Sequence, residues 1–467
     1  MPRHYLLQSA LLGNGWAHDV LIGVADDGRI TEIAPASPTL RATAVNAESV
    51  SGFVVPGMAN AHSHAFQRAM AGNTEYRLSA KDSFWTWRQA MYSLANRIEP
   101  EDLELLATQL FVEMLKAGYT TVAEFHYLHR RADGELYAGA NAMWDAIDAA
   151  AAATGIGLTF LPTLYQTSDF GAQALKSEQR RFALETEDFL EKIAQRLALE
   201  RQQAPGTVRT GAAFHSLRAV PLPVLREAAL ALRAMDAALP VHIHVAEQVR
   251  EVDACQLATG RRPVELLLDS GLLTEHWCLV HATHSTLEEL KGIAVAAATV
   301  CVSISTEANL GDGFFDAARF FRIGGRICVG SDSQATVCPS EELRWLEYQQ
   351  RLRKKRRAVL VNTGEPHVGT RLWRDAARHG AQAVGSGAGT LAVGRRADWL
   401  VLEAAHPSMA GASADFALDH LLFAGGSAAI RDVMVAGRWV VRDRHHGHED
   451  SLRARFAQLM GRYRDLG

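Results

Sequence analysis

The sequence lacks the cysteine patterns that indicate a disulfide framework or a thiolate metal site. It has five scattered cysteines in 467 residues, and no two of them form a Cys-x-x-Cys pair. It also lacks an uncharged apolar stretch long enough to span a bilayer, and its first residues have no apolar core of a signal peptide. We therefore expect a cytoplasmic protein that does not associate with membranes.

A strong excess of charge of either sign is also missing. The formal net charge is −4, and the densest basic run, residues 351–357, contains no aromatic side chain that could stack on bases. Apolar residues make up 48% of the chain and charged residues 21%, which is typical of a globular protein with a sizeable core. These properties argue against a nucleic-acid partner and against disorder.

Both ends of the chain have short apolar runs separated by Gly, Asp and Asn, a pattern typical of small antiparallel strands with tight turns. Because the two ends share this pattern and the long middle does not, we expect residues 1–55 and 393–467 to form one composite β-sandwich domain. The runs are residues 5–12, 20–24 and 30–33 near the N-terminus and residues 398–402 and 430–441 near the C-terminus.

The middle of the chain, residues 56–392, alternates short apolar strands with amphipathic helical patterns such as residues 101–116 and 222–235. Eight strands with intervening helices predict a (β/α)8 barrel of TIM type, in which catalytic side chains lie at the carboxyl ends of the strands. The strand candidates are residues 54–58, 120–125, 157–161, 208–214, 241–245, 277–281, 299–303 and 327–330.

Polar residues at the strand ends form a candidate metal site. His62 and His64 follow the first strand candidate, and a His-x-His pair on an extended chain projects both imidazoles from one face. The fifth strand candidate offers His242 and His244. We choose His244, which lies nearer the carboxyl end, and give His242 a structural role. Asp332, after the eighth strand candidate, supplies a fourth ligand.

Three imidazoles and one carboxylate suit one divalent ion, with Zn2+ as the first expectation and Fe2+ as an alternative. A two-metal site is less expected, because no lysine follows the fourth strand candidate to bridge two ions. Glu247 stands three residues after His244, and His281 ends the sixth strand candidate. A carboxylate and an imidazole beside a metal indicate acid–base catalysis.

These elements together resemble the mononuclear deaminase branch of the amidohydrolase superfamily. The shared pattern is His-x-His after strand one, His-x-x-Glu at strand five, a histidine at strand six and an aspartate after strand eight. Further segments resemble one member family, the formimidoylglutamate deiminases. One departure is visible, because residues 303–306, Ser-Ile-Ser-Thr, stand where a proline-containing run is expected. The segments are residues 62–72, 124–129, 214–220 and 306–313.

The resemblance implies the hydrolysis of N-formimidoyl-L-glutamate to N-formyl-L-glutamate and ammonia, a reaction of histidine degradation. It implies that Glu247 carries the proton from water to the departing nitrogen, while His281 and Asp332 orient the water. The small-molecule substrate has two carboxylates, which arginine can bind bidentately. A homodimer is the default expectation for such a barrel. The implied substrate contacts are Arg88 to one carboxylate, Tyr127, His215 and Arg218 to the other, and Gln67 to the formimino group.

Two other functions stay open at this point. A related mononuclear deaminase could act on a purine, pterin or triazine ring, and its pocket would require aromatic stacking and donors to the ring edge. A metal-binding barrel without catalytic activity would retain the ligands and lack the acid–base residues. The presence of Glu247, His281 and Asp332 argues against this second alternative.

Overall fold

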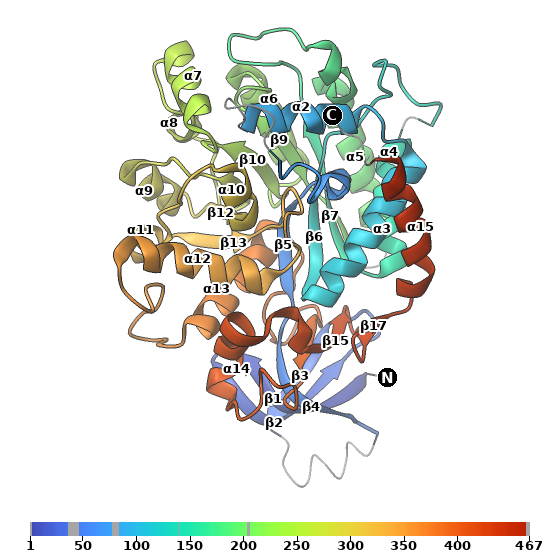
Figure 1. Cartoon of the computed structure of the whole chain (residues 1–467), viewed down its shortest axis with the longest axis vertical. Helices are drawn as coiled ribbons and strands as arrows, with labels where there is room; N and C mark the ends of the chain where they lie inside the picture. Colours follow the sequence, from blue (N-terminus) through green and yellow to red (C-terminus); the bar gives the residue numbers. More distant parts are fainter. Residues whose placement is uncertain (1, 36–45, 77–83, 140, 203–205, 464–467) are drawn as a thin grey trace.

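Two sheets organise the molecule in a computed structural model that describes residues 2–35, 46–76, 84–139, 141–202 and 206–463. One is a nearly closed parallel barrel surrounded by helices, and the other is a separate sheet formed by both chain ends (Figure 1). The predicted TIM-type barrel is therefore confirmed. Among the described helices, none combines the length and the apolar character that crossing a membrane requires.

The barrel strands pair in parallel in the order in which they occur along the chain, except that the short strand β8 (Val208–Thr210) pairs with β7 outside this path. Their residues are almost all buried, as expected for strands covered on both faces. The strands are β5 (Met58–Ser63), β6 (Tyr119–His126), β7 (Gly157–Leu164), β9 (Ala212–Ser216), β10 (Val241–Val245), β11 (Trp277–His281), β12 (Thr299–Val302) and β13 (Arg326–Val329).

The barrel closes between β5 and the residues after β13. Asp332 donates its amide to the His62 carbonyl oxygen at 2.9 Å and accepts from the His64 amide at 3.2 Å, and Ser63 and Asp332 form a parallel bridge. A side chain at Gly330 would prevent this approach, since its Cβ would lie 2.7 Å from the Cβ of His62. The residues that close the barrel therefore include three of the predicted metal ligands, His62, His64 and Asp332.

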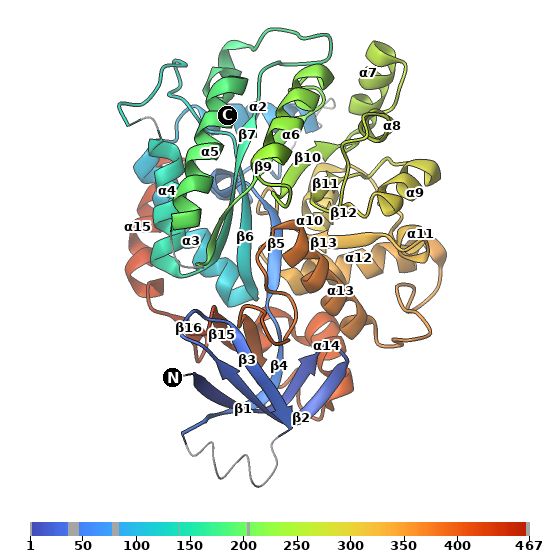
Figure 2. The same cartoon turned by 180° about the vertical axis from the view of Figure 1, so that it is seen from behind.

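The helices lie around the barrel (Figures 1 and 2). Helix α3 shows how their ends are defined: it begins at Pro100, has Glu101 in its first turn, and ends before Gly118, whose φ of 107° favours glycine. The helices around the barrel are α2 (Phe84–Ala95), α3 (Pro100–Ala117), α4 (Ala142–Thr154), α5 (Thr186–Gln202), α6 (Leu222–Met235), α7 (Val249–Thr259), α8 (Pro263–Asp269), α9 (Leu287–Val295), α10 (Ile304–Leu310), α11 (Ala317–Arg322), α12 (Pro339–Lys354) and α13 (Val368–Ala383), with the 3-10 helices η1 (Ala65–Met70) and η2 (Ser177–Phe182).

The second sheet joins the two chain ends where β4 pairs with β14. It has its own core, in which the rings of Tyr5 and Trp399 lie 5.3 Å apart. The last helix, α15 (Glu449–Arg462), lies beside α3 (Figures 1 and 2), and Lys116 pairs with Glu449 at 2.6 Å. In spatial order the strands are β17 (His445–His446), β16 (Arg438–Arg442), β15 (Ile430–Val435), β14 (Trp399–Leu402), β4 (Glu48–Pro56), β1 (Arg3–Leu12), β2 (Gly15–Val24) and β3 (Ile30–Pro35).

The predicted bounds of the first barrel strand, residues 54–58, were wrong. Strand β4 ends at Pro56 in the terminal sheet, and the barrel begins with β5 at Met58. Gly57 lies at this passage, where a Cβ would come within 2.3 Å of the Thr120 side chain. His62 therefore lies within the first barrel strand and His64 directly after it, instead of both following the strand.

Candidate metal centre and active site

The four predicted ligands converge at the mouth of the barrel. His62 Nε2 and His64 Nε2 lie 3.3 and 3.4 Å from the same oxygen of Asp332, Oδ1. The Nε2 atom of His244, on β10, lies 3.0 Å from Nε2 of His62. One ligand atom from each of the four residues lies within 4.8 Å of all the others, and the four side chains are buried. The fold therefore brings these four donors to one point.

The protonation states of these four side chains allow the cluster to bind a cation. Because a carbonyl oxygen only accepts hydrogen bonds, Nδ1 of His64 donates to Phe125 and Nδ1 of His244 donates to His215, each at 2.9 Å. Burial lowers the pKa of His64 to about 3 and the pKa of His244 well below its ordinary value, so both imidazoles are neutral. Their Nε2 lone pairs face the centre together with a carboxylate, which is a donor set that fits one divalent metal ion.

A second cluster adjoins the first and contains the two predicted acid–base residues. His281 Nε2 lies 3.7 Å from both Glu247 Oε1 and Asp332 Oδ2. Asp312, in the loop after α10, completes a group whose ligand atoms lie within 4.8 Å of one another. Burial raises the pKa of Glu247 to about 7. Burial opposes the charging of His281, but Glu247 and the neighbouring carboxylates raise its pKa well above the ordinary value.

The backbone at the strand ends is held in an uncommon conformation. His281, Ala282, Ala246 and Asp332 have φ values of 69°, 50°, 52° and 49°, in the left-handed region that residues with side chains rarely adopt. All four lie at or just beyond the carboxyl ends of β10, β11 and β13. Backbone strain of this kind concentrates at functional sites, and here it coincides with the two clusters.

Glu307 is a residue of this site that sequence reasoning missed. Its Oε1 lies 3.3 Å from Nδ1 of His281 and accepts the Ser303 amide at 3.1 Å. The side chain is fully buried, so this contact fixes the orientation of the His281 ring. Glu307 lies in residues 306–313, one of the segments that carried the family resemblance. Its pairing with a histidine 26 residues earlier is a tertiary contact, which no local pattern indicates.

Two of the predicted substrate contacts line the metal centre. Gln67 Nε2 donates to the hydroxyl of Tyr127 at 2.9 Å. The Tyr127 ring packs edge-on against His64 and His215, with ring centroids 5.0 and 5.5 Å apart. The Oε1 atom of Gln67 is buried and has no hydrogen-bond partner among the described residues. It is therefore placed to accept a hydrogen bond from a ligand.

The two predicted arginines form the positive side of the site. Burial lowers the pKa of His215 well below its ordinary value, and the charges of Arg218 and then Arg88 lower it further, which places both guanidinium groups near this ring. Arg88 Nε, on α2, donates to the hydroxyl of Tyr92 at 2.5 Å. The Nε atom of Arg218 is buried without a partner among the described residues. Two positive groups therefore lie beside His215, and the charge of Arg218 also acts on Glu247.

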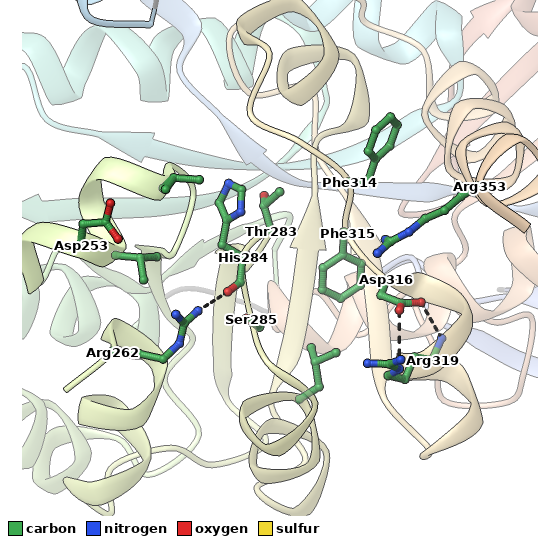
Figure 3. A pocket seen from close by; sticks show the side chains of 13 residues that line it. Asp253, Arg262, Thr283, His284, Ser285, Phe314, Phe315, Asp316, Arg319 and Arg353 are labelled. Atoms are coloured by element: carbon green, nitrogen blue, oxygen red, sulfur yellow. Dashed lines mark hydrogen bonds and ion pairs between the residues drawn. The ribbon is translucent and has the colours of Figure 1, made fainter. Parts of the chain in front are cut away.

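A cavity of about 420 Å3 lies beside the second cluster (Figure 3). Arg262 donates to the His284 carbonyl in its wall, and Asp316 accepts the Arg319 amide at 3.2 Å. His284 Nε2 in turn donates to the carbonyl of Asp312 at 2.9 Å. The loop between α10 and α11 therefore contributes residues both to the cavity wall and, through Asp312, to the second cluster.

Comparison with known proteins agrees with this arrangement. The model of the amidohydrolase family matches residues 53–440. A formimidoylglutamate deiminase of Pseudomonas aeruginosa is 49% identical over 98% of this chain and 99% of its own length. An 8-oxoguanine deaminase of the same organism is 29% identical over 90% of this chain and 89% of its own length. The crystal structure of an amidohydrolase from Brucella melitensis superposes with a TM-score of 0.89 and 41% identity, covering 99% of both chains. The predicted superfamily resemblance is confirmed, and the chain belongs to the amidohydrolase family.

Proposed function

We propose that this chain catalyses the hydrolytic deimination of N-formimidoyl-L-glutamate, yielding N-formyl-L-glutamate and ammonia, as a step of histidine degradation. The observation that carries the proposal is the acid–base pair Glu247 and His281 beside a four-donor cation centre, with Arg88 and Arg218 near His215. A substrate with a cationic amidine and two carboxylates complements this distribution of charge. The deiminase of Pseudomonas aeruginosa, similar over nearly the whole chain, supports the same substrate.

We assign one Zn2+ ion to His62, His64, His244 and Asp332, with Fe2+ as the alternative. The four buried donors lie close enough together for one ion to be held by all of them, because one ligand atom from each lies within 4.8 Å of the others. When bound, the ion supplies Lewis acidity, which makes water a nucleophile near neutral pH.

Glu247 carries the proton in this reaction. With a pKa of about 7, its carboxylate accepts a proton from the attacking water and passes it to the terminal nitrogen of the amidine. The water oxygen forms a bond to the formimino carbon, the bond from that carbon to the terminal nitrogen breaks, and ammonia leaves. His281 and Asp332 orient the water, and Glu307 holds the His281 ring.

The substrate carboxylates are bound by the remaining residues. Arg88 binds one carboxylate, and Arg218 binds the other together with Tyr127 and His215, where charge-assisted hydrogen bonds are strongest. His215 is neutral, so it contributes a hydrogen bond without adding a third positive charge. Gln67 binds the formimino group through its free Oε1 atom.

A substrate panel tests this proposal. Steady-state ammonia release would be measured with the formimino derivatives of glutamate and aspartate, and with guanine and adenosine. We expect turnover of the glutamate derivative and none of the rings. Turnover of a ring compound, with none of the acyclic amidines, would contradict the proposal and favour a ring deaminase.

We also propose a cytoplasmic homodimer, because twofold dimers are the commonest assemblies of soluble proteins. Light scattering on the purified protein tests the assembly. A mass of two chains supports it, and a mass of one chain would contradict it.

A further inference from the structure

Asp312 is a buried carboxylate to which the mechanism above assigns no role. Its side chain is only 5% exposed. One oxygen, Oδ1, accepts from the side-chain Nε2 of Gln248, whereas Oδ2 is buried without a hydrogen-bond partner among the described residues. An unpartnered carboxylate oxygen in a protein interior is costly unless a ligand completes it.

Hydrogen bonds of its backbone hold Asp312 in place in the loop after α10. Its amide donates to the Glu307 carbonyl, and its own carbonyl accepts from Nε2 of His284, both at 2.9 Å. His284 forms part of the cavity wall in Figure 3. The free oxygen of Asp312 is therefore held beside the end of α10. The same helix carries Glu307, which contacts His281.

Asp312 and Glu247 form a pair of neighbouring carboxylates. With His281, their ligand atoms lie within 4.8 Å of one another. Burial, followed by the charge of Glu247, raises the pKa of Asp312 to about 9. Asp312 therefore holds a proton near neutral pH while the site is empty, and a bound cation, which relieves the repulsion between the two carboxylates, favours its ionised form.

We propose that Asp312 is the second carboxylate of an amidinium-binding pair, and that it binds the cationic formimino group of the substrate together with Glu247. This inference rests on the proposed function and deepens it. An amidinium is planar and carries N–H donors on both nitrogens, so two carboxylates can each accept from it, as they do from guanidinium groups. The N-formyl product is a neutral amide, so the pair favours the binding of substrate over product.

The test compares a cation with a neutral molecule of the same shape. Binding of acetamidinium and of acetamide to the zinc-loaded enzyme would be measured by ligand-observed NMR titration. Asp312→Asn removes the second carboxylate, which is ionised when a cation is bound, with little change in size. Asp188→Asn, at an exposed position of α5, is the matched control.

In Asp312→Asn we expect acetamidinium to bind at least about tenfold more weakly, with acetamide binding unchanged. The control should match the wild type for both molecules. Equal weakening of both molecules, or unchanged binding of acetamidinium, would overturn the proposal. So would two divalent ions per wild-type chain and one in the variant, since the cluster would then be a second metal site.

Two further measurements keep the result interpretable. Thermal unfolding verifies that the variant is folded, and Asp312→Ser carries the same test if the asparagine variant does not fold. Since neither probe molecule is a substrate, the binding preference is read independently of turnover. Absence of turnover with formimidoylglutamate would contradict the proposed function and leave the charge preference at Asp312 as a separate result.

Discussion

Burial shifts the pKa values of neighbouring side chains of this site in opposite directions. It keeps His64 and His244 neutral, with lone pairs available for a cation, while it raises the pKa of Glu247 to about 7. His281 is charged because carboxylates surround it. Pairs of titratable groups whose environments push their pKa values apart are typical of acid–base catalysts.

Glu247→Gln tests the proposed proton carrier. Glutamine keeps the size and part of the hydrogen bonding of the side chain but cannot accept a proton. We expect turnover to fall by at least about a hundredfold, with metal content equal to the wild type. An unchanged rate in a metal-loaded variant would refute the role.

The pH dependence of the rate should report the same group. Glu247 accepts a proton only as a carboxylate, and its pKa is raised to about 7. As the pH falls below this value the base becomes protonated, so kcat/KM should fall about tenfold for each further pH unit. The pH profile of Glu247→Gln should lack this limb. A wild-type profile that stays flat to pH 5 would show that no such base is required.

Two strands of the barrel, β5 and β13, depend on a close approach between their backbones. The contact between β5 and β13 closes the barrel and carries His62, His64 and Asp332. At Gly330 a Cβ would meet the Cβ of His62 at 2.7 Å and its carbonyl oxygen at 2.8 Å. Neither of these groups can move without displacing a metal ligand.

Gly330→Ala should therefore destabilise the protein by about 1–3 kcal/mol, as overpacking of a core commonly does, and it should reduce metal content. Denaturant unfolding and metal analysis would measure both effects. Gly461→Ala, in α15 with no heavy atom near its would-be Cβ, is the control. Equal stability of the two variants would contradict the proposed closure.

Sequence patterns were sufficient for the barrel because its strands are short, mostly apolar segments that alternate with helical patterns. They did not find the passage at Gly57, where one apolar run serves two sheets. The predicted ligands could be named because they follow local patterns at strand ends. Glu307, in α10, and Asp312, in the loop after it, could not, because they meet His281 and Glu247 only through tertiary packing.

In the whole molecule, the terminal sheet meets the barrel at the passage from β4 to β5, which leads directly to the metal centre. We propose a composite domain of residues 1–55 and 393–467 and a catalytic domain of residues 56–392. Ligands from β5, β10 and the residues after β13 link distant parts of the barrel through one ion. Metal binding should therefore stabilise the folded state of the whole barrel.

Removal of the metal should lower both activity and thermal stability. After dialysis against a chelator we expect loss of turnover and a lower Tm, and addition of one equivalent of Zn2+ should restore both. Differential scanning calorimetry and the ammonia assay measure the two effects. Full activity in a protein shown to be free of metal would contradict the assigned centre.

The most direct test of the central claim is ammonia release from N-formimidoyl-L-glutamate, measured together with the metal content of the same sample. Metal-dependent deimination requires saturable turnover in proportion to bound metal, reaching its maximum at one divalent ion per chain. Turnover that does not depend on bound metal, or its absence in a fully metal-loaded sample, would contradict it.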